Sequence, residues 1–316
     1  MRDSARPIIW LLTDEKPGHK SQLRGLANRL KAHAAAKSWW IDCREVAVGR
    51  LHAMLGRRPA SLEIPEEFAQ PDMIIAAGQG THRLMEALRR QSAMKVVLMR
   101  PSFPQRWMDA CIIPAHDDPK PGPNLLITTG VLNAVAPLAR LTDKRQALVL
   151  LGGPSRHYQW DEADLVHQLQ LLREHYPEWQ WVVSTSRRTP ESTLRAIQPL
   201  ATPRFSLVDY RDTHSQWHAH TLSDSRAVWV TPDSASMVYE AVTSGVPTGL
   251  FNLPAGKSGR VSQGIRQLLN QNMAHSLDDH RQVMHHSGQE PSNSLWEADR
   301  AARWLLERWQ QGPARR

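Results

Sequence analysis

Small and hydroxyl-bearing residues stand just before a predicted helix in the second half of the sequence. Ser234 and Ser236 follow an apolar run at residues 228–231, and Glu240 comes about one helical turn later. The first turn of a helix carries backbone N–H groups without intrahelical acceptors and a partial positive charge, so it attracts anions. The carboxylate of Glu240 repels phosphate but accepts hydrogen bonds from the hydroxyl groups of a ribose. The spacing therefore indicates a nucleotide site, and an ordinary capped helix with Glu240 in solvent is the alternative.

Other loops of the second half carry residue types that bind phosphate. Gly152 and Gly153 follow a predicted buried strand, and a glycine pair lets a ligand approach the backbone closely. Hydroxyl and guanidinium groups in further loops supply hydrogen-bond donors. Each loop alone is compatible with ordinary turn chemistry, but their recurrence at the carboxyl edge of one sheet favours a ligand site. The candidate donor-binding residues are Gly152, Gly153, Ser155, Arg156, Ser186, Arg187, Ser234, Ser236, Glu240, Lys257 and Arg260.

The first half offers a candidate general base, His19, in the loop that follows the apolar run at residues 7–12. An imidazole titrates near neutrality, which suits the removal of a proton from a sugar hydroxyl. Asp14 either orients His19 or acts as the base itself. Because the chain has 15 histidines, a plain surface role for His19 is the alternative. The same loop lacks the G-x-G-x-x-G pattern, so we predict no nicotinamide or flavin cofactor.

Short apolar runs alternate with segments of helical periodicity along the whole chain, which predicts an α/β fold. The region 130–145 separates one series of strands and helices from the next. We predict two Rossmann-like domains that face each other across a cleft, at residues 1–140 and 141–290. The segment 291–316 contains a final amphipathic helix, which we expect to cross back to the first domain.

Capping residues predict where several helices begin. Ser21 precedes a helix-period segment in the first half, so we expect residues 13–20 to form a loop. Asp161 is the expected cap of a helix that carries Leu165 and Leu169. Asp233 is of the same residue type, and it precedes the helix with Glu240.

The formal net charge is +8, which points to a polyanionic partner. No helix-turn-helix, RNP or zinc-finger signature is present, so we exclude nucleic acid. Phosphorylated substrates and an anionic membrane surface remain. The segment 50–58 places Leu51 and Met54 between arginines, which fits either a membrane-facing patch or a solvated helix.

Neither a secretory signal nor an apolar run of about 20 residues is visible. Cys43 and Cys111 fit no disulfide framework and no metal-ligand spacing. We therefore predict a cytoplasmic protein without a metal site, with peripheral association at the inner face of the cytoplasmic membrane as an option.

The sequence resembles the mitochondrial-fission ELM family, whose bacterial members are treated as glycosyltransferases and include proteins linked to lipooligosaccharide outer-core assembly. The segment 233–247 is also similar to the nucleotide-sugar half of type-B glycosyltransferases, with Gly245 and Pro247 in the turn that follows the helix. The motifs that carry the family resemblance are T-D-E-K-P-G-H-K-S-Q at 13–22, G-G-P-S-R-H-Y-Q-W at 152–160, S-R-R-T-P at 186–190, D-S-A-S-M-V-Y-E-A at 233–241 and K-S-G-R-V at 257–261.

The resemblance implies a GT-B-like fold and a metal-independent transfer of a sugar from a nucleotide-sugar donor to a lipopolysaccharide-core or other cell-envelope glycan or glycolipid. Positive groups of the second domain would stabilise the departing diphosphate, and His19 would be the base. A nucleotide-sugar epimerase and a non-enzymatic interaction scaffold, the role implied by the plant member, are the two alternatives.

Overall fold

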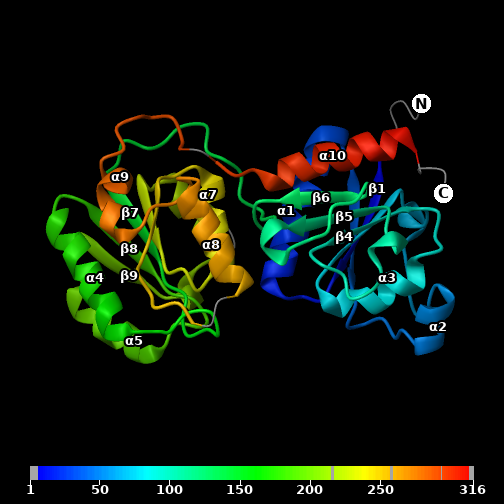
Figure 1. Cartoon of the computed structure of the whole chain (residues 1–316), viewed down its shortest axis with the longest axis horizontal. Coiled ribbons are helices and arrows are strands. Elements are labelled where there is room, and N and C mark those ends of the chain that lie inside the picture. The colour runs from blue at the N-terminus through cyan, green and yellow to red at the C-terminus, as the bar shows by residue number, and fades with distance from the viewer. Residues whose placement is uncertain (1–5, 215–216, 257–258, 293, 313–316) are drawn as a thin grey trace. The chain divides into compact units, whose positions relative to one another are not determined.

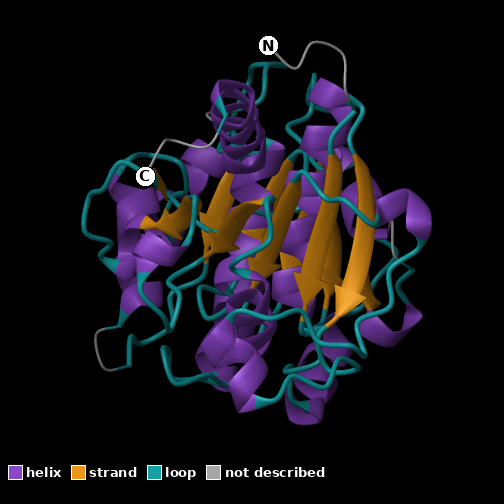
Figure 2. Ribbon diagram, turned by 90° about the vertical axis from the view of Figure 1, so that its right-hand side faces the viewer, coloured by secondary structure: helices purple, strands orange, loops and turns teal. Residues whose placement is uncertain are grey.

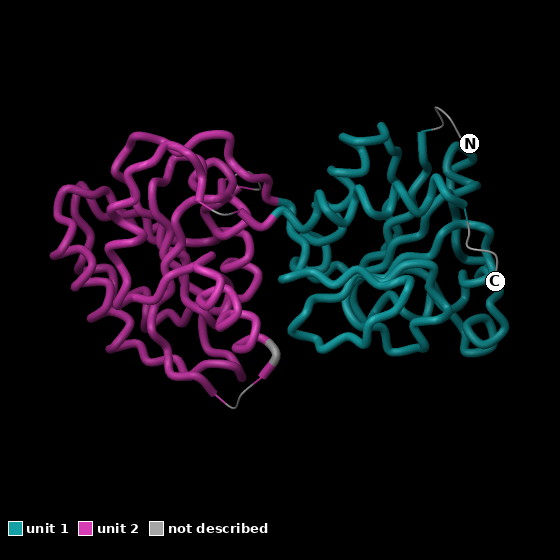
Figure 3. Tube along the Cα trace, turned by 45° about the horizontal axis from the view of Figure 1, so that its top comes forward, with its two compact units in different colours: residues 1–134, 296–316 teal, residues 135–295 magenta. Residues whose placement is uncertain are grey.

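The computed structural model describes residues 6–214, 217–256, 259–292 and 294–312 (Figure 1). The chain divides into two compact units (Figure 3). Unit 1 consists of Met1–Ala134 together with Trp296–Arg316, and unit 2 consists of Val135–Leu295. The division at Ala134 lies inside the segment 130–145 that the sequence marks as a separator. The two units are described separately below.

Unit 1 contains a six-stranded parallel sheet in the order β2-β1-β3-β4-β5-β6. Helices cover both faces of this sheet (Figure 2). Short 3-10 turns lie at Glu66–Phe68, Gln79–Thr81, Gln105–Trp107 and Ala115–Asp117. The strands are β1 (Ile8–Thr13), β2 (Lys37–Asp42), β3 (Met73–Ala77), β4 (Met94–Leu98), β5 (Ala110–Pro114) and β6 (Leu125–Thr128), and the helices are α1 (Pro17–Ala34), α2 (Arg50–Leu55), α3 (His82–Leu88) and α10 (Glu297–Gln311).

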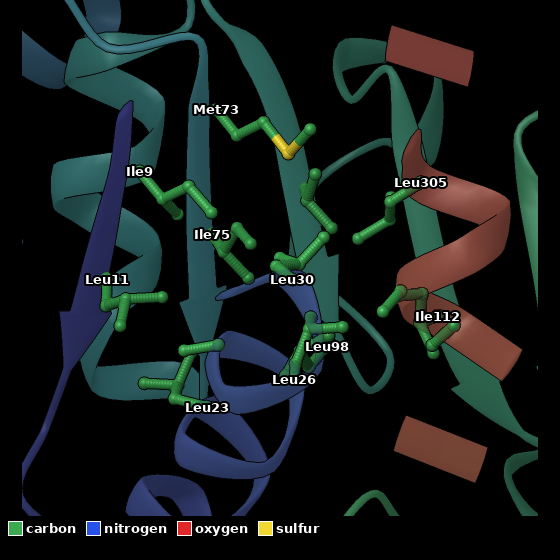
Figure 4. Close-up of a cluster of buried hydrophobic side chains, with 14 of the residues drawn as sticks. Ile9, Leu11, Leu23, Leu26, Leu30, Met73, Ile75, Leu98, Ile112 and Leu305 are labelled. Atoms are coloured by element: carbon green, nitrogen blue, oxygen red, sulfur yellow. The ribbon is translucent and has the colours of Figure 1, made fainter. Parts of the chain in front are cut away.

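The central strands of unit 1 are apolar along their whole length because both of their faces are buried. In β1, Ile9 and Leu11 pack on the face covered by α1 and α10. Trp10 and Leu12 pack on the opposite face, which α3 covers. Figure 4 shows the first of these two clusters, in which leucines of α1 spaced at helical intervals meet the sheet.

Helix α10 is fixed to unit 1 by polar contacts as well as by apolar ones. Asp299 accepts hydrogen bonds from Arg29 Nε and His33 Nε2, each at 2.7 Å, and from Arg303 Nε at 2.8 Å. Burial alone would raise the pKa of Asp299, but the hydrogen bonds from His33 and Arg29 outweigh it and hold this pKa below its usual value. Glu297 accepts a hydrogen bond from the backbone N–H of Thr129 at 3.1 Å.

Unit 2 contains a five-stranded parallel sheet in the order β11-β10-β7-β8-β9, so the chain builds one half outward from β7 and then returns to build the other. Short 3-10 turns lie at Gln198–Leu200, Tyr210–Asp212 and Leu277–Asp279. The strands are β7 (Gln146–Leu150), β8 (Gln180–Ser184), β9 (Phe205–Val208), β10 (Ala227–Val230) and β11 (Thr248–Leu250), and the helices are α4 (Glu162–His175), α5 (Glu191–Ile197), α6 (Trp217–Ser223), α7 (Ala235–Ser244), α8 (Arg260–Asn270) and α9 (His280–Met284).

Both units are α/β with parallel sheets, which confirms the predicted fold class. The predicted cap of α4 is also confirmed, since Asp161 accepts a hydrogen bond from the N–H of Asp164 at 3.0 Å. The predicted start of α1 is wrong. The helix begins at Pro17, so Ser21 is an interior residue and His19 lies in the first turn. Proline is favoured at the first helical position because it has no N–H to leave unpaired there.

No helix within the described ranges combines the length and the apolar character needed to cross a membrane.

Candidate functional site

Each sheet has one point at which the chain reverses its direction of growth, and parallel α/β sheets bind ligands beside such points, at the carboxyl ends of their strands. In unit 1 the point lies between β1 and β3, and in unit 2 it lies between β7 and β10. The loops that follow these four strands contain most of the candidate residues.

The loop after β1 and the first turn of α1 bring Asp14 and His19 into direct contact. His19 Nδ1 lies 2.7 Å from Asp14 Oδ1. The Asp14 side chain is 6% exposed and that of His19 is 20% exposed. Burial raises the pKa of Asp14, but the hydrogen bond and the charge of His19 together lower it below its ordinary value. Asp14 is therefore ionised near neutrality and accepts the Nδ1 proton, which leaves His19 Nε2 as the basic nitrogen.

Two glycines after β3 make room for this pair. Gly78 has φ +91°, and a Cβ on it would overlap the imidazole ring of His19. A Cβ on Gly80 would lie 2.7 Å from the Cβ of Asp14. Residues 78–81 read Gly-Gln-Gly-Thr, and nothing in that run by itself points to His19. Its role in the structure is to let the β1 and β3 loops approach each other closely.

A second imidazole, His82, lies beside this pair at the start of α3. Ser102, in the loop after β4, places its Oγ 2.7 Å and its backbone N 3.3 Å from His82 Nδ1. A backbone N–H only donates, so Nδ1 is the acceptor and the proton of the neutral ring is on Nε2. Burial lowers the pKa of His82, and the nearby charge of His19 lowers it further. Sequence reasoning missed both His82 and Ser102, because nothing local links them to His19.

In unit 2 the loops after β7 and β10 are joined by hydrogen bonds. Gly152 N–H donates to Thr231 Oγ1 at 2.7 Å, and Gly153 N–H donates to Asp233 Oδ2 at 3.0 Å. A Cβ on Gly152 would overlap the carboxylate of Asp233. The close approach that the glycine pair permits is thus made by a side chain of the protein itself.

Asp233, Ser234 and Ser236 are all residue types that cap a helix start, and the structure shows which of them stands at the start of α7. Ser234 is the residue at the cap position, and neither its own side chain nor that of Asp233 makes a cap hydrogen bond. The carboxylate of Asp233 instead binds Arg188 Nη2 at 2.7 Å. Arg188 Nη1 also donates to the carbonyl oxygen of Gly153 at 3.2 Å. Tertiary contacts across the sheet edge therefore override the local capping preference.

The second carboxylate oxygen of Asp233, Oδ1, is buried. Its side chain is 1% exposed, and Oδ1 has no hydrogen-bond partner within the part of the chain that the structure describes. A buried acceptor of this kind is costly to leave unpaired, so it is a natural partner for a donor group of a ligand.

The loop after β8 contributes its hydroxyl groups to the framework. Ser186 Oγ donates to the carbonyl oxygen of Gly152 at 3.0 Å, and Thr189 Oγ1 donates to the same oxygen at 2.6 Å. Arg187 is exposed and makes no ion pair among the described residues. The guanidinium that reaches the glycine loop is thus Arg188, which the sequence prediction did not include.

Ser155 and Arg156 lie in the loop after β7. Ser155 Oγ accepts hydrogen bonds from the N–H groups of His157 at 3.1 Å and Tyr158 at 3.3 Å, so this hydroxyl shapes the turn. Arg156 is exposed, with Nε 3.3 Å from His157 Nε2. Burial lowers the pKa of His157, and the positive charges of Arg156 and Arg188 lower it further. The edge of unit 2 is electropositive at this point.

Of the predicted residues on α7, Ser234 is buried and Ser236 is exposed. Glu240 is half-buried, and its Oε2 lies 3.6 Å from His218 Nδ1 of α6. Burial lowers the pKa of His218 to about 4, so this ring is neutral at pH 7. Its contact with Glu240 is therefore not an ion pair at that pH. Lys257 lies outside the described residues. Arg260 is described only as the first residue of α8.

The structure thus joins Asp14 to His19, Gly152 and Gly153 to the loop after β10, and Ser186 to Gly152. Among the described residues, Arg187 takes no part in these contacts, and Glu240 lies beside His218. No group of three or more histidine, cysteine, aspartate or glutamate side chains that could hold a metal ion occurs within the described ranges.

Comparisons with known proteins agree with this architecture. Solved structures with the same fold include the UDP-GlcNAc 2-epimerase of Methanocaldococcus jannaschii, with a TM-score of 0.58, 11% identity, and 96% of this chain and 100% of that chain covered. MnaA of S. aureus, in a co-structure with UDP, has a TM-score of 0.54, 12% identity and coverages of 96% and 97%. MurG of Acinetobacter baumannii has a TM-score of 0.54, 12% identity and coverages of 97% and 100%. These likenesses show a GT-B-like fold with two Rossmann-like domains.

Comparisons of sequence find a distant relative and a family match. An uncharacterized protein of Rickettsia prowazekii (strain Madrid E), RP120, is 23% identical over 340 residues, which cover 90% of this chain and 94% of that protein. The family described as Mitochondrial fission ELM1 matches residues 17–309. This match spans nearly the whole chain and both units, so the protein belongs to the mitochondrial fission ELM1 family.

Proposed function

We propose that this protein is a glycosyltransferase that moves a sugar from a nucleotide-sugar donor to a hydroxyl group of a cell-envelope glycan or glycolipid, such as a lipopolysaccharide core. Unit 2 binds the donor, and unit 1 supplies the base. The observation that carries the proposal is the Asp14–His19 contact of 2.7 Å beside the reversal point of the unit 1 sheet. An ionised carboxylate that fixes one nitrogen of an imidazole makes the other nitrogen a positioned base.

In the proposed reaction His19 Nε2 accepts the proton of the acceptor hydroxyl. The acceptor oxygen forms a bond to the anomeric carbon of the donor sugar, and the bond from that carbon to the diphosphate breaks. The diphosphate leaves with the electron pair. In this proposal the first turn of α7 and the exposed guanidinium groups of Arg156 and Arg187 stabilise its charge, so no metal ion is required. Lys257 and Arg260 assist, as their residue types allow.

Glu240 is the proposed ribose ligand. It is half-buried on α7, and its Oε2 lies 3.6 Å from Nδ1 of the neutral His218 ring. A nucleotide at the start of α7 would place phosphate at the helix tip and pentose further along the helix. The likeness in fold to a structure solved with UDP and to a UDP-GlcNAc epimerase supports a nucleotide sugar as the ligand class.

The test is nucleotide binding followed by product analysis. UDP-, GDP- and CMP-sugars are titrated into the full chain by calorimetry. We expect Glu240→Ala to lower the affinity for the nucleotide about 10- to 100-fold, which is the range for the loss of a hydrogen bond to a charged group. Glu307→Ala, an exposed residue on α10, is the matched control. Unchanged affinity in Glu240→Ala removes the ribose assignment. Absence of binding by every sugar nucleotide favours a scaffold.

A second candidate function is a nucleotide-sugar epimerase, because the structure with the TM-score of 0.58 is a UDP-GlcNAc 2-epimerase. An epimerase releases an altered sugar nucleotide and needs no acceptor, whereas a transferase consumes the donor only when an acceptor is present. Incubation of the donor with and without a cell-envelope glycolipid fraction, followed by mass spectrometry and sugar analysis, separates the two.

A further inference from the structure

Helix α2 of unit 1 exposes two large apolar side chains side by side. Leu51 is 60% exposed and Met54 is 68% exposed. They are three residues apart, so they occupy the same face of the helix. The other large apolar side chains of the described chain that reach the surface are at most 39% exposed. Single exposed apolar residues are ordinary, but this adjacent pair is the most exposed apolar feature that the structure describes.

Positive charge surrounds this pair. Arg50 and Arg57 flank it in sequence, and residues 50–58 contain no acidic residue. Arg90, at the end of α3, packs on the same helix: a Cβ on Gly56 would lie 3.0 Å from Arg90 Cγ. All three arginines are exposed, and none forms an ion pair with a carboxylate in the described ranges. We define the α2 surface as Arg50, Leu51, Met54, Arg57 and Arg90.

The α2 surface is built by tertiary contacts. The guanidinium of Arg89 donates to the carbonyl oxygens of Ala53 and Met54 at the end of α2. It also lies 5.2 Å from the ring centroid of Trp107. Gly56 ends α2 with φ +64°. These contacts bind α2 to α3, beside which Figure 1 draws it, so the exposed apolar pair is held on a fixed element.

We propose that the α2 surface docks this protein on an anionic lipid membrane. Leucine and methionine side chains enter the boundary between headgroups and acyl chains, and arginines beside them meet anionic headgroups. The net charge of +8 adds long-range attraction to the same partner. A protein partner is the less suitable occupant. The apolar pair and the arginines around it complement a surface that is both negatively charged and apolar, as an anionic lipid membrane is.

Docking at this place also bears on the reaction. Helix α3 begins at His82, beside the Asp14–His19 pair, and ends at Leu88, next to Arg89 and Arg90. Its seven residues span about 10 Å. Under the proposed function the acceptor is then a glycolipid of the bound membrane. Docking itself does not depend on nucleotide binding, so the two can fail separately.

The test is co-sedimentation of the full chain with vesicles of phosphatidylcholine alone and with added phosphatidylglycerol. We expect binding only with phosphatidylglycerol, and weaker binding at higher salt. Each arginine near an anionic surface contributes about fivefold to the partition coefficient. The pair Arg50→Gln and Arg57→Gln should therefore lower binding by roughly 25-fold, and Leu51→Ser with Met54→Ser should abolish stable pelleting.

Matched controls lie in unit 2. Leu171→Ser replaces an exposed leucine on α4, and Arg195→Gln replaces an exposed arginine on α5. Both should bind vesicles as the unaltered chain does, and all variants should keep its melting temperature and nucleotide affinity. Equal binding by the α2 variants and the controls overturns the proposal. So does equal binding to neutral and anionic vesicles, or a dimer that only the α2 variants dissociate.

Discussion

The guanidinium of Arg188 lies 2.7 Å from the carboxylate of Asp233, across the loops that follow β8 and β10. The same carboxylate accepts the N–H of Gly153. One of the backbone donors expected to meet a diphosphate is therefore already occupied, and one guanidinium beside it is neutralised. This edge of unit 2 is thus a preformed framework, and under the proposed function the exposed arginines and the first turn of α7 remain for the anion.

Loss of this ion pair should destabilise the chain. Arg188→Ala leaves the carboxylate of Asp233 buried with one partner fewer, which we expect to lower the free energy of unfolding by about 1–3 kcal/mol. Urea unfolding followed by tryptophan fluorescence measures it. The neighbouring variant Arg187→Ala removes an exposed side chain and should change stability by less than about 0.5 kcal/mol. Equal effects of the two variants would contradict the structural role of Arg188.

The Asp14–His19 pair should control the rate of transfer. His19→Ala removes the proposed base, and general-base groups contribute about 10²- to 10⁴-fold. Asp14→Asn keeps the shape of the side chain but removes the charge that fixes the Nδ1 proton, so we expect a large loss of kcat with little change in the donor KM. Steady-state kinetics with an active donor and acceptor check both. A full rate in His19→Ala would exclude it as the base.

Gly78→Ala tests the same pair through the backbone. A Cβ at this position overlaps the ring of His19, and φ +91° is unfavourable for alanine. We expect His19 to be displaced, with a loss of activity comparable to that of His19→Ala and a lower melting temperature. Gly18→Ala, one residue before His19, places its Cβ where no atom lies within 4 Å, so activity should be kept. Full activity in Gly78→Ala would show that the loops do not need this close approach.

The attachment of α10 should weaken in acid. The pKa of Asp299 is lower in the folded chain than its ordinary value near 3.9. Its stabilising contribution is therefore complete above that value and is lost as the pH falls through the lower, folded-state pKa. Asp299→Asn should be less stable than the unaltered chain at pH 7, and the difference should shrink below about pH 4.

Thermal unfolding as a function of pH measures this difference. The control is Asp143→Asn, because the side chain of Asp143 is 72% exposed. This variant should stay within about 0.5 kcal/mol of the unaltered chain at every pH. A difference for Asp299→Asn that does not depend on pH would show that packing, and not charge, is lost.

The sequence predicts the strands well where burial makes them uniformly apolar. β3, β6 and β9 coincide with the apolar runs at residues 73–77, 125–128 and 205–208, because each run is delimited by polar or turn-forming residues. The start of α1 fails because two start signals, Pro17 and Ser21, compete within five residues, and the proline prevails. Hydrophobic periodicity and composition locate the helices and strands, but they do not decide between two neighbouring signals for the start of a helix.

The candidate site is harder to predict because its decisive contacts join residues far apart in sequence. The hydrogen bond from Gly153 to Asp233 spans 80 positions, and that from Ser102 to His82 spans 20. Residue types drew attention to Gly153 and His19. The choice of Arg188 over Arg187, and the presence of His82 beside His19, depend on which loops the sheet order brings together. The roles of Glu240 and Lys257 stay predictions.

The return of α10 to unit 1 has a consequence for how the chain matures. The apolar face of α1 and its sheet packs against Ala301, Leu305 and Trp309, which are synthesised after the whole of unit 2. Unit 2 is continuous in sequence and has all of its residues available earlier. During synthesis, the first segment of unit 1 therefore keeps an apolar surface uncovered until α10 has been made. Clipping the tail should expose that surface to chaperones and aggregation while sparing the lobe made in between.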